Sequence, residues 1–152
     1  MKMSQDNQTK YDDNNLFAKM LNGDIPYHKV FEDDKTLAFM DIMPQAKGHV
    51  LVIPKQNAVD LVDLEPEYAA AVLMTAKKVM QAQRQVLERE GIIQMQLNGA
   101  QAGQTVFHYH VHILPHYEKN DLSLHFTNHM NELNKEDYQV RLQAIKKVLN
   151  QN

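Results

Sequence analysis

The sequence predicts an α+β fold in which helices pack on an antiparallel sheet, and three observations support this prediction. Two apolar segments joined by a short turn, residues 28–33 and 36–42, indicate a strand meander. Apolar residues three and four positions apart predict a long helix over residues 66–90. No internal repeat or long linker divides the 152 residues, so we expect one domain with one core.

The N-terminal part is predicted to contain a tail, a short helix and three strands. Residues 1–14 show no apolar period and predict a mobile tail. Residues 16–24 predict a short helix, because their apolar side chains share one face before an Asn-Gly stop. The strands over 28–33 and 36–42 meet at an Asp-rich turn. The apolar segment 49–54 predicts a third, buried strand that ends at a proline.

The C-terminal part is predicted to contain two helices and two further strands. The helix over 66–90 begins with a proline between two glutamates, which suits a first turn. Residues 92–98 predict a strand, and a glycine-containing loop over 98–104 follows it. Residues 106–114 predict the fifth strand. Residues 135–149 predict an amphipathic helix.

Composition limits the classes of function. The formal net charge is −3, so no basic field attracts nucleic acid or an anionic membrane. Cysteine is absent, which excludes disulfides and thiolate metal sites within this sequence. No segment has the length and apolar character of a membrane span, and the polar N-terminus is not a signal peptide. We therefore expect a soluble, cytoplasmic protein without nucleic-acid or membrane partners.

The segment HYHVHILP, residues 108–115, carries three histidines at alternate positions. On a strand this spacing places His108, His110 and His112 on one face, roughly 6.5 to 7 Å apart at the backbone. That spacing leaves room for a small anionic group between the rings. The other face then takes the alternate residues, which we expect in the core: Tyr109, Val111 and Ile113.

Three interpretations of the histidines remain open from the residues alone. The imidazoles could be hydrogen-bonded at the sheet surface without a further role. Two could chelate zinc or iron, although Glu118 falls beyond the strand and a further ligand is needed. One could be a nucleophile toward phosphorus, with the others orienting it. The preceding Gly103-Gln104-Thr105 segment and Asn98 offer donors that suit phosphate oxygens.

Two separate segments resemble the histidine-triad (HIT) family. GQTVFHYHVHILP resembles the triad signature of three histidines separated by apolar residues. LFAKMLNGDIPYHKVFEDDKTLAFMDIMPQAKGHVLVIPK resembles the N-terminal region of the Hint-like and bacterial Hit branches. The resemblance covers residues 15–118, leaving a tail at 1–14 and a helical extension at 119–152. It implies a HIT-like five-stranded sheet that extends across a homodimer.

The resemblance also implies the role of each site residue. His110 would be the nucleophile that forms a nucleotidyl-histidine intermediate, and His112 would contact the phosphate or leaving group. His108 would hold the geometry of the cluster, and His49 matches the fourth histidine of the family. Asp41 matches the residue that binds the ribose hydroxyls. The remaining nucleotide-binding positions line the base pocket or contact the phosphate and leaving group: Leu16, Phe17, Met20, Ile42, Asn98, Gln104 and Thr105.

The resemblance therefore predicts a hydrolase of a purine nucleoside phosphoramidate or a dinucleoside polyphosphate, without a cofactor. It also predicts no bound zinc, because Asn15 and Ala18 stand where many bacterial relatives carry the two cysteines of a structural zinc site. Two alternatives stay open. One is a His-ligated metalloenzyme, and the other is a nucleotide-binding regulatory module in which catalysis is vestigial.

Overall fold

The computed structural model describes residues 9–88, 90–116, 129 and 134–150. The chain divides into two compact units, Met1–Leu122 and Ser123–Asn152. The second unit contains α3 (Lys135–Leu149), whose bounds are those that the sequence predicts and whose first turn is capped by the Asn134 side chain. Within the described residues, none of the helices combines the length and the apolar character needed to cross a bilayer.

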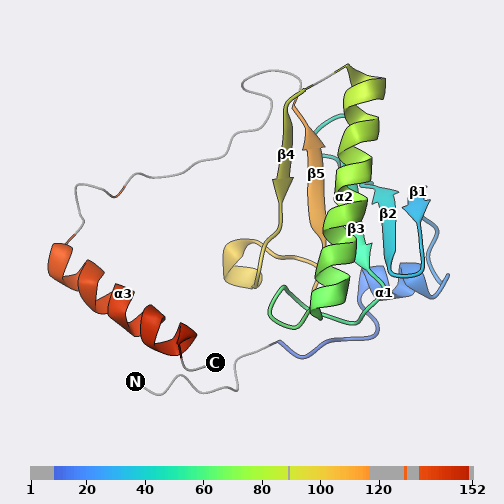
Figure 1. Ribbon diagram of the computed structural model, residues 1–152. Helices are drawn as coiled ribbons and strands as arrows, with labels where there is room; N and C mark the ends of the chain where they lie inside the picture. Colours follow the sequence, from blue (N-terminus) through green and yellow to red (C-terminus); the bar gives the residue numbers. More distant parts are fainter. Residues whose placement is uncertain (1–8, 89, 117–128, 130–133, 151–152) are drawn as a thin grey trace. The chain divides into compact units, whose positions relative to one another are not determined.

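The first unit is built on a five-stranded antiparallel sheet, which confirms the predicted fold class (Figure 1). The strands follow the spatial order β1-β2-β3-β5-β4, so β1 and β4 form the two edges. Their bounds are β1 Lys29–Glu32, β2 Thr36–Met40, β3 Val50–Pro54, β4 Ile92–Met95 and β5 Val111–Pro115.

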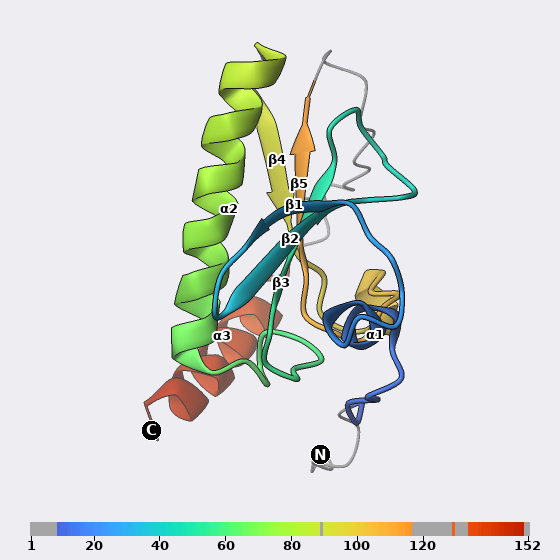
Figure 2. The same ribbon diagram turned by 90° about the vertical axis from the view of Figure 1, so that its right-hand side faces the viewer.

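One face of the sheet packs against the long helix α2 (Pro66–Leu87), as Figure 2 shows. Alternate strand positions supply this face with apolar side chains because successive residues of a strand point to opposite sides. Ala38, Val52, Val111 and Ile113 are each no more than 1% exposed there. Tyr109 joins the same cluster, so the predicted core positions of the histidine segment are confirmed.

The opposite face of the sheet is covered in part by the short helix α1 (Leu16–Leu21) (Figure 2). The intervening strand positions point to this side and form a second core with the helix. Its buried members are Phe17, Met20, Leu37, Phe39, Leu51 and Ile53. Six residues of helix shield far less of the sheet than the 22 residues of α2, and a pocket lies beside α1.

The fifth strand is shorter than predicted. The sequence predicts a strand over 106–114, whereas β5 begins at Val111. The pairing explains the difference: the last partner on β3 faces Val111, and β4 ends at Met95, opposite His112. Residues 106–110 therefore lie beyond the end of β4, and although β3 itself continues to Pro54, no ladder pairs join them to it and hold them in an extended conformation.

Helix α2 ends earlier than predicted and exposes part of its apolar pattern. The predicted end was residue 90, but Glu88 adopts the left-handed conformation (φ 53°) and stops the helix after Leu87. Leu73 and Val86 fit the apolar period but are 54% and 76% exposed. Leu73 lies on the flank of the helix that the sheet does not cover, whereas Val86 follows the buried period of Val79 and lines a surface hollow near the end of the helix.

The predicted mobile tail includes residues that are held against the first unit. Residues 1–8 of that prediction lie outside the described residues. Within residues 9–14, the Tyr11 hydroxyl lies 2.6 Å from His108 Nδ1, and Asp13 accepts a hydrogen bond from the Asn57 side chain at 3.0 Å. Asn15 then caps α1 by accepting from two backbone amides of its first turn. For residues 9–14 the expectation of a free tail is therefore revised.

Candidate functional site

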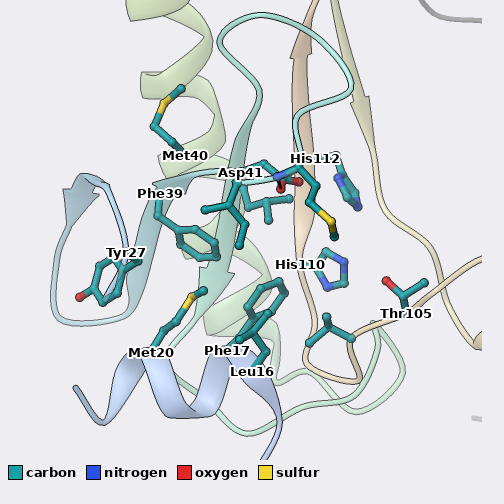
Figure 3. A pocket seen from close by; sticks show the side chains of 14 residues that line it. Leu16, Phe17, Met20, Tyr27, Phe39, Met40, Asp41, Thr105, His110 and His112 are labelled. Atoms are coloured by element: carbon teal, nitrogen blue, oxygen red, sulfur yellow. Dashed lines mark hydrogen bonds between the residues drawn. The ribbon is translucent and has the colours of Figure 1, made fainter. Parts of the chain in front are cut away.

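A pocket lies between α1 and the part of the sheet that α1 leaves uncovered, and its empty space, with the open solvent at its mouth included, is about 580 Å³ (Figure 3). Most of its wall is apolar, and the polar groups gather at one side. Its lining comprises Leu16, Phe17, Met20, Tyr27, Phe39, Met40, Asp41, Ile42, Met43, Leu51, Thr105, Val106, His110 and His112. A predominantly apolar pocket with a few convergent polar groups is the usual form of a small-ligand site.

His110 lies at the wall with one ring nitrogen committed to the backbone. Its Nδ1 is 2.6 Å from the carbonyl oxygen of His108. A carbonyl can only accept, so Nδ1 carries the proton and donates it, and Nε2 keeps its lone pair. The ring is 7% exposed and contacts the edge of Phe17, with 5.0 Å between ring centroids. His110 is therefore a neutral imidazole held in one tautomer, with its nucleophilic nitrogen not used by this bond.

His112 is fixed in the opposite tautomer through His49. The backbone N–H of Gln45 lies 3.2 Å from His49 Nδ1 and donates to it, so the proton of His49 sits on Nε2. That nitrogen is 3.0 Å from His112 Nδ1, which accepts. The proton of His112 is consequently on Nε2. His112 lines the pocket, and its ring centroid lies 5.0 Å from that of His110. A hydrogen-bond donor, His112 Nε2–H, and a nucleophile, His110 Nε2, are therefore neighbours.

His108 is buried behind the pocket wall and does not line the pocket. Its exposed fraction is 0%, and its Nε2 donates to the carbonyl oxygen of Pro54 at 2.9 Å. Its Nδ1 therefore accepts from the Tyr11 hydroxyl. His49 is likewise fully buried, so neither residue belongs to the pocket lining. Both lie one layer behind the histidines that reach the cavity.

Burial keeps the four histidines neutral. Removal from water disfavours the charged imidazolium and lowers the pKa of His108 and of His112 to about 4. The pKa of His112 is lowered further by the neighbouring His110 and His49. Burial also lowers the pKa values of His49 and His110, against the opposing influence of Asp41. A neutral imidazole near pH 7 can act as a nucleophile, which a protonated ring cannot.

Asp41 follows β2 and places a carboxylate at the rim of the polar side. Its Oδ1 accepts from the backbone N–H of Met43 at 2.8 Å, which fixes the side chain in a turn. Its Oδ2 lies 3.5 Å from His49 Nδ1. The carboxylate can therefore stabilise positive charge on the His49–His112 pair while retaining acceptor capacity toward the pocket.

The three predicted phosphate contacts are placed differently from one another. Thr105 lines the pocket on the same side as His110 and His112 (Figure 3). Gln104 is buried, and its amide closes the 99–104 loop by accepting from Gly99 and donating to the carbonyls of Val59 and Val106. Asn98 accepts from the Leu61 amide through Oδ1. Neither Gln104 nor Asn98 belongs to the lining of the pocket, so their side chains shape the loop that presents Thr105.

The predicted base-pocket positions meet at the apolar end of the cavity. Figure 3 shows Leu16, Phe17 and Met20 rising from α1 below the cavity, with Tyr27 and Phe39 along the side opposite the histidines. Phe17 and Phe39 pack edge to face at 5.4 Å. The predicted Ile42 lies at the opening and is 68% exposed. This end can enclose a flat aromatic group.

A metal ion has one candidate set of ligands among the described residues. Asp41, His49 and His112 each offer a ligand atom within 4.8 Å of the others. However, His49 Nε2 and His112 Nδ1 point at each other across a 3.0 Å hydrogen bond, and His49 Nδ1 accepts from Gln45. Metal binding at this set requires these bonds to break. At the two positions where the resemblance placed the cysteines of a zinc site, Asn15 Oδ1 is occupied in the helix cap and the Ala18 side chain has no donor atom.

Sequence reasoning missed several lining residues, and one signal could have found two of them. Phe39 and Leu51 are register partners on β2 and β3, two residues from Asp41 and His49 along each strand. The period of two therefore places them on the face that carries the site. Tyr11, by contrast, lies in a polar segment without apolar periodicity, and no local pattern indicates its contact with His108.

Comparison with known proteins gives matches along most of the chain. The HIT domain family matches residues 22–119. The protein Hit of Bacillus subtilis is 39% identical over 138 residues, which cover 90% of this chain and 95% of that protein. An adenosine 5′-monophosphoramidase of Schizosaccharomyces pombe is 43% identical over 100 residues, covering 66% of this chain and 72% of the relative. The crystal structure of a HIT family protein from Bacillus anthracis superposes with a TM-score of 0.82 at 37% identity, covering 91% of this chain and 99% of that one.

Proposed function

The chain belongs to the HIT family, and we propose that it is a hydrolase of purine nucleotide conjugates that works through a nucleotidyl-His110 intermediate. The observation that carries this proposal is the pair of opposite tautomers at the pocket wall. His110 keeps a lone pair on Nε2, whereas His112 keeps a proton on Nε2. A nucleophile and an acid are the two groups that displacement at phosphorus needs.

In the first step, His110 Nε2 attacks the α-phosphorus and the bond to the leaving group breaks. The leaving group departs with the Nε2 proton of His112, which leaves that ring anionic, and the His49 Nε2–H that donates to His112 Nδ1 stabilises this negative charge. The Nδ1–H of His110 remains bonded to the His108 carbonyl, which stabilises the positive charge that develops on the ring. The product is a phosphorus–nitrogen bond at His110.

In the second step, water attacks the nucleotidyl-His110. Water gives one proton to the His49–His112 pair and its oxygen to phosphorus, which releases His110 with its lone pair restored. This proton returns the His49–His112 pair from its anionic form to the neutral form in which it began. Across the two steps one water is consumed, the leaving group is protonated, and the residues return to their starting states.

The nucleoside end of the substrate suits the apolar end of the pocket. The enclosed aromatic face of Phe17 and the side chains of Met20 and Phe39 favour a stacked or edge-packed purine ring. Asp41, between that end and the histidines, is positioned to accept from ribose hydroxyls, which supports the role that the family resemblance implies for it. The similarity to the S. pombe relative, an adenosine 5′-monophosphoramidase, supports a phosphoramidate as the conjugate.

A direct assay with two substrates tests the function. Purified protein is incubated in parallel with an adenosine 5′-phosphoramidate and with a matched diadenosine polyphosphate, and release of nucleoside monophosphate is measured. We expect turnover of the phosphoramidate to exceed that of the polyphosphate. Binding without turnover of either compound would reject the hydrolase and favour a regulatory nucleotide-binding module.

A second candidate function is a His-ligated metalloenzyme, which the Asp41–His49–His112 cluster favours. The nucleophilic mechanism needs no metal, so we expect activity to change by less than about twofold after dialysis against a chelator. Loss of activity on chelation, with recovery after addition of zinc alone, would establish the metalloenzyme instead.

We also propose that two copies of the chain associate. β4 is an edge strand of the sheet, and α2 exposes Leu73, Met74 and Val86 at 54%, 55% and 76%. An unpaired strand edge and exposed apolar side chains are features that a homodimer covers. Light scattering on eluting protein should give twice the mass of the chain, which is 17.6 kDa. A mass of one chain at micromolar concentration would exclude the dimer.

A further inference from the structure

The N-terminal segment around Tyr11 contacts the back of the histidine cluster, and none of the family-derived roles includes it. The Tyr11 hydroxyl lies 2.6 Å from His108 Nδ1, and the two rings meet edge on with 5.6 Å between centroids. Tyr11 is absent from the pocket lining, so it does not reach a ligand there. Tyr11 therefore acts on the site through its neighbours, His108 and the Asn15 side chain that caps α1.

The hydrogen bonds of His108 have assigned directions. Its Nε2 faces the Pro54 carbonyl at 2.9 Å and must donate, which leaves Nδ1 as an acceptor for the tyrosine hydroxyl. Burial raises the pKa of Tyr11, so the phenol keeps its proton at neutral pH and remains a donor. With both nitrogens engaged, the buried His108 ring has one tautomer and one orientation.

The orientation of His108 matters because its backbone carbonyl holds the nucleophile. His110 Nδ1 donates to that carbonyl at 2.6 Å. Residues 106–110 lie outside the strand ladder, which begins at Val111. In place of ladder bonds, the two ring contacts of His108 and a bond from the Tyr109 amide to the Ala58 carbonyl fix this stretch of backbone.

The segment that carries Tyr11 is itself attached at two further points. Asp13 Oδ1 accepts from the Asn57 side chain at 3.0 Å, beside the Ala58 carbonyl that Tyr109 uses. The Asn15 side chain caps α1, whose Phe17 packs edge on against both His108 and His110 at 6.3 and 5.0 Å between centroids. Residues 11–17 therefore contact both imidazoles from one side.

We propose that Tyr11 is a positioning residue: its hydroxyl locks His108 and thereby holds the carbonyl that orients His110. This inference rests on the proposed function, because it assigns Tyr11 a role in the attack by His110. Through this bond Tyr11 helps to fix the backbone of residues 106–110, which no strand pairing holds. It extends the functional unit to a segment that precedes the first helix.

The test compares Tyr11→Phe with Tyr68→Phe in the full-length protein. Tyr68 lies at the start of α2 and packs on the other face of the sheet, so its variant removes a phenolic hydroxyl away from the site. We expect Tyr11→Phe to lower kcat roughly tenfold and to change KM less than about threefold, because misplacing a reacting group slows chemistry more than binding. Asp13→Ala, which loosens the same segment, should give a smaller loss of kcat, and Tyr68→Phe none.

Imidazole ¹⁵N resonances of the ligand-free protein provide the second readout. In the wild type, His108 should show a protonated Nε2 and a hydrogen-bonded Nδ1, and Tyr11→Phe should shift the Nδ1 signal of His108 and broaden that of His110. A Tyr11→Phe variant with unchanged kcat and a lowered melting temperature would overturn the inference and leave a structural role only. Absence of wild-type turnover would instead reject the proposed function, while the ¹⁵N signals would still decide whether the Tyr11–His108 bond exists.

Discussion

The two faces of the sheet are built from the same strands but serve different purposes. The face toward α2 buries Ala38, Val52, Val111 and Ile113 almost completely under a 22-residue helix. The face toward α1 carries His112 beside Leu51, its register partner, under a helix of only six residues. The first face has only a shallow apolar hollow near the end of α2, whereas the second retains the pocket that His110 and His112 line.

The difference shows how strand alternation separates stability from chemistry. In β5, Val111 and Ile113 enter the α2 core, and His112 between them faces the pocket. The apolar neighbours therefore anchor a polar residue whose own burial is unfavourable. Substitutions on the pocket face should therefore mainly change activity, and substitutions on the α2 face should mainly change stability.

The largest expected effect is on the pocket face. His110→Ala removes the nucleophile, and we expect kcat to fall by about 10⁴-fold or more, as happens when a covalent catalyst is deleted. Nucleotide binding and the melting temperature should change little, because the apolar wall and the α2 core remain. Steady-state kinetics and ligand titration check both statements. Substantial turnover by pure variant protein would contradict the assignment of His110.

A substitution on the α2 face should have the opposite profile. Ile113→Ala empties a fully buried position and should lower the free energy of unfolding by about 2–5 kcal/mol. Since Ile113 points away from the pocket, kcat should stay within about threefold of the wild type at temperatures where the variant is folded. Denaturant unfolding and kinetics on the same preparation measure the two effects. A large loss of kcat in fully folded variant would break the separation of the faces.

Acid should weaken the protein through the pocket face. Because His108 and His112 have folded pKa values of about 4, below the unfolded value of about 6.5, the unfolded chain binds more protons between these values. Their contribution to stability is present above pH 6.5 and is lost as the pH falls toward 4. Proton uptake in the unfolded chain by each of the two histidines should lower the free energy of unfolding by about 1 kcal/mol as the pH falls from 6.5 to 5.5.

Denaturant unfolding at a series of pH values measures this slope, with His108→Asn as the comparison. The variant lacks one of the two buried imidazoles and should show a shallower slope over the same range. Equal slopes in the two proteins would mean that His108 is not held in its neutral form by the fold.

The smallest effect concerns ribose recognition at the rim of the pocket. Asp41→Asn keeps an oxygen that can accept from the Met43 amide but replaces the second carboxylate oxygen with a donor. We expect KM for a ribonucleotide conjugate to rise about tenfold, the scale of a lost charge-assisted hydrogen bond. Wild type should prefer the ribose form over its 2′-deoxy analogue, and the variant should lose that preference. Unchanged discrimination in Asp41→Asn would remove Asp41 from this role.

Much of the fold could be predicted from local sequence, because its signals are local. Period-two alternation placed Tyr109, Val111 and Ile113 in the core, and the period of the long helix identified α2. The start of β5 was not predictable in this way, since it depends on where its pairing with β3 and β4 stops. Strand boundaries are set by partners that lie far away in the sequence.

The candidate site shows the same division between local and distant information. The histidine spacing and the family resemblance indicated His108, His110 and His112 as a group, and the structure brings His110 and His112 together at the pocket. The hydrogen bond between Tyr11 and His108 joins residues 97 positions apart, so no local pattern could predict it. The buried bonds of Gln104 likewise depend on a loop closing on Val59.

The central claim is that the Nε2 lone pair of His110 forms a bond to phosphorus, and intact-protein mass spectrometry after rapid acid-free quenching tests it most directly. Wild-type protein mixed with an adenosine 5′-phosphoramidate should transiently gain the mass of one adenylyl group. Peptide mapping should locate that group on His110, and His110→Ala should gain nothing. An adduct on another histidine, or turnover by wild type with no adduct at any mixing time, would contradict the claim.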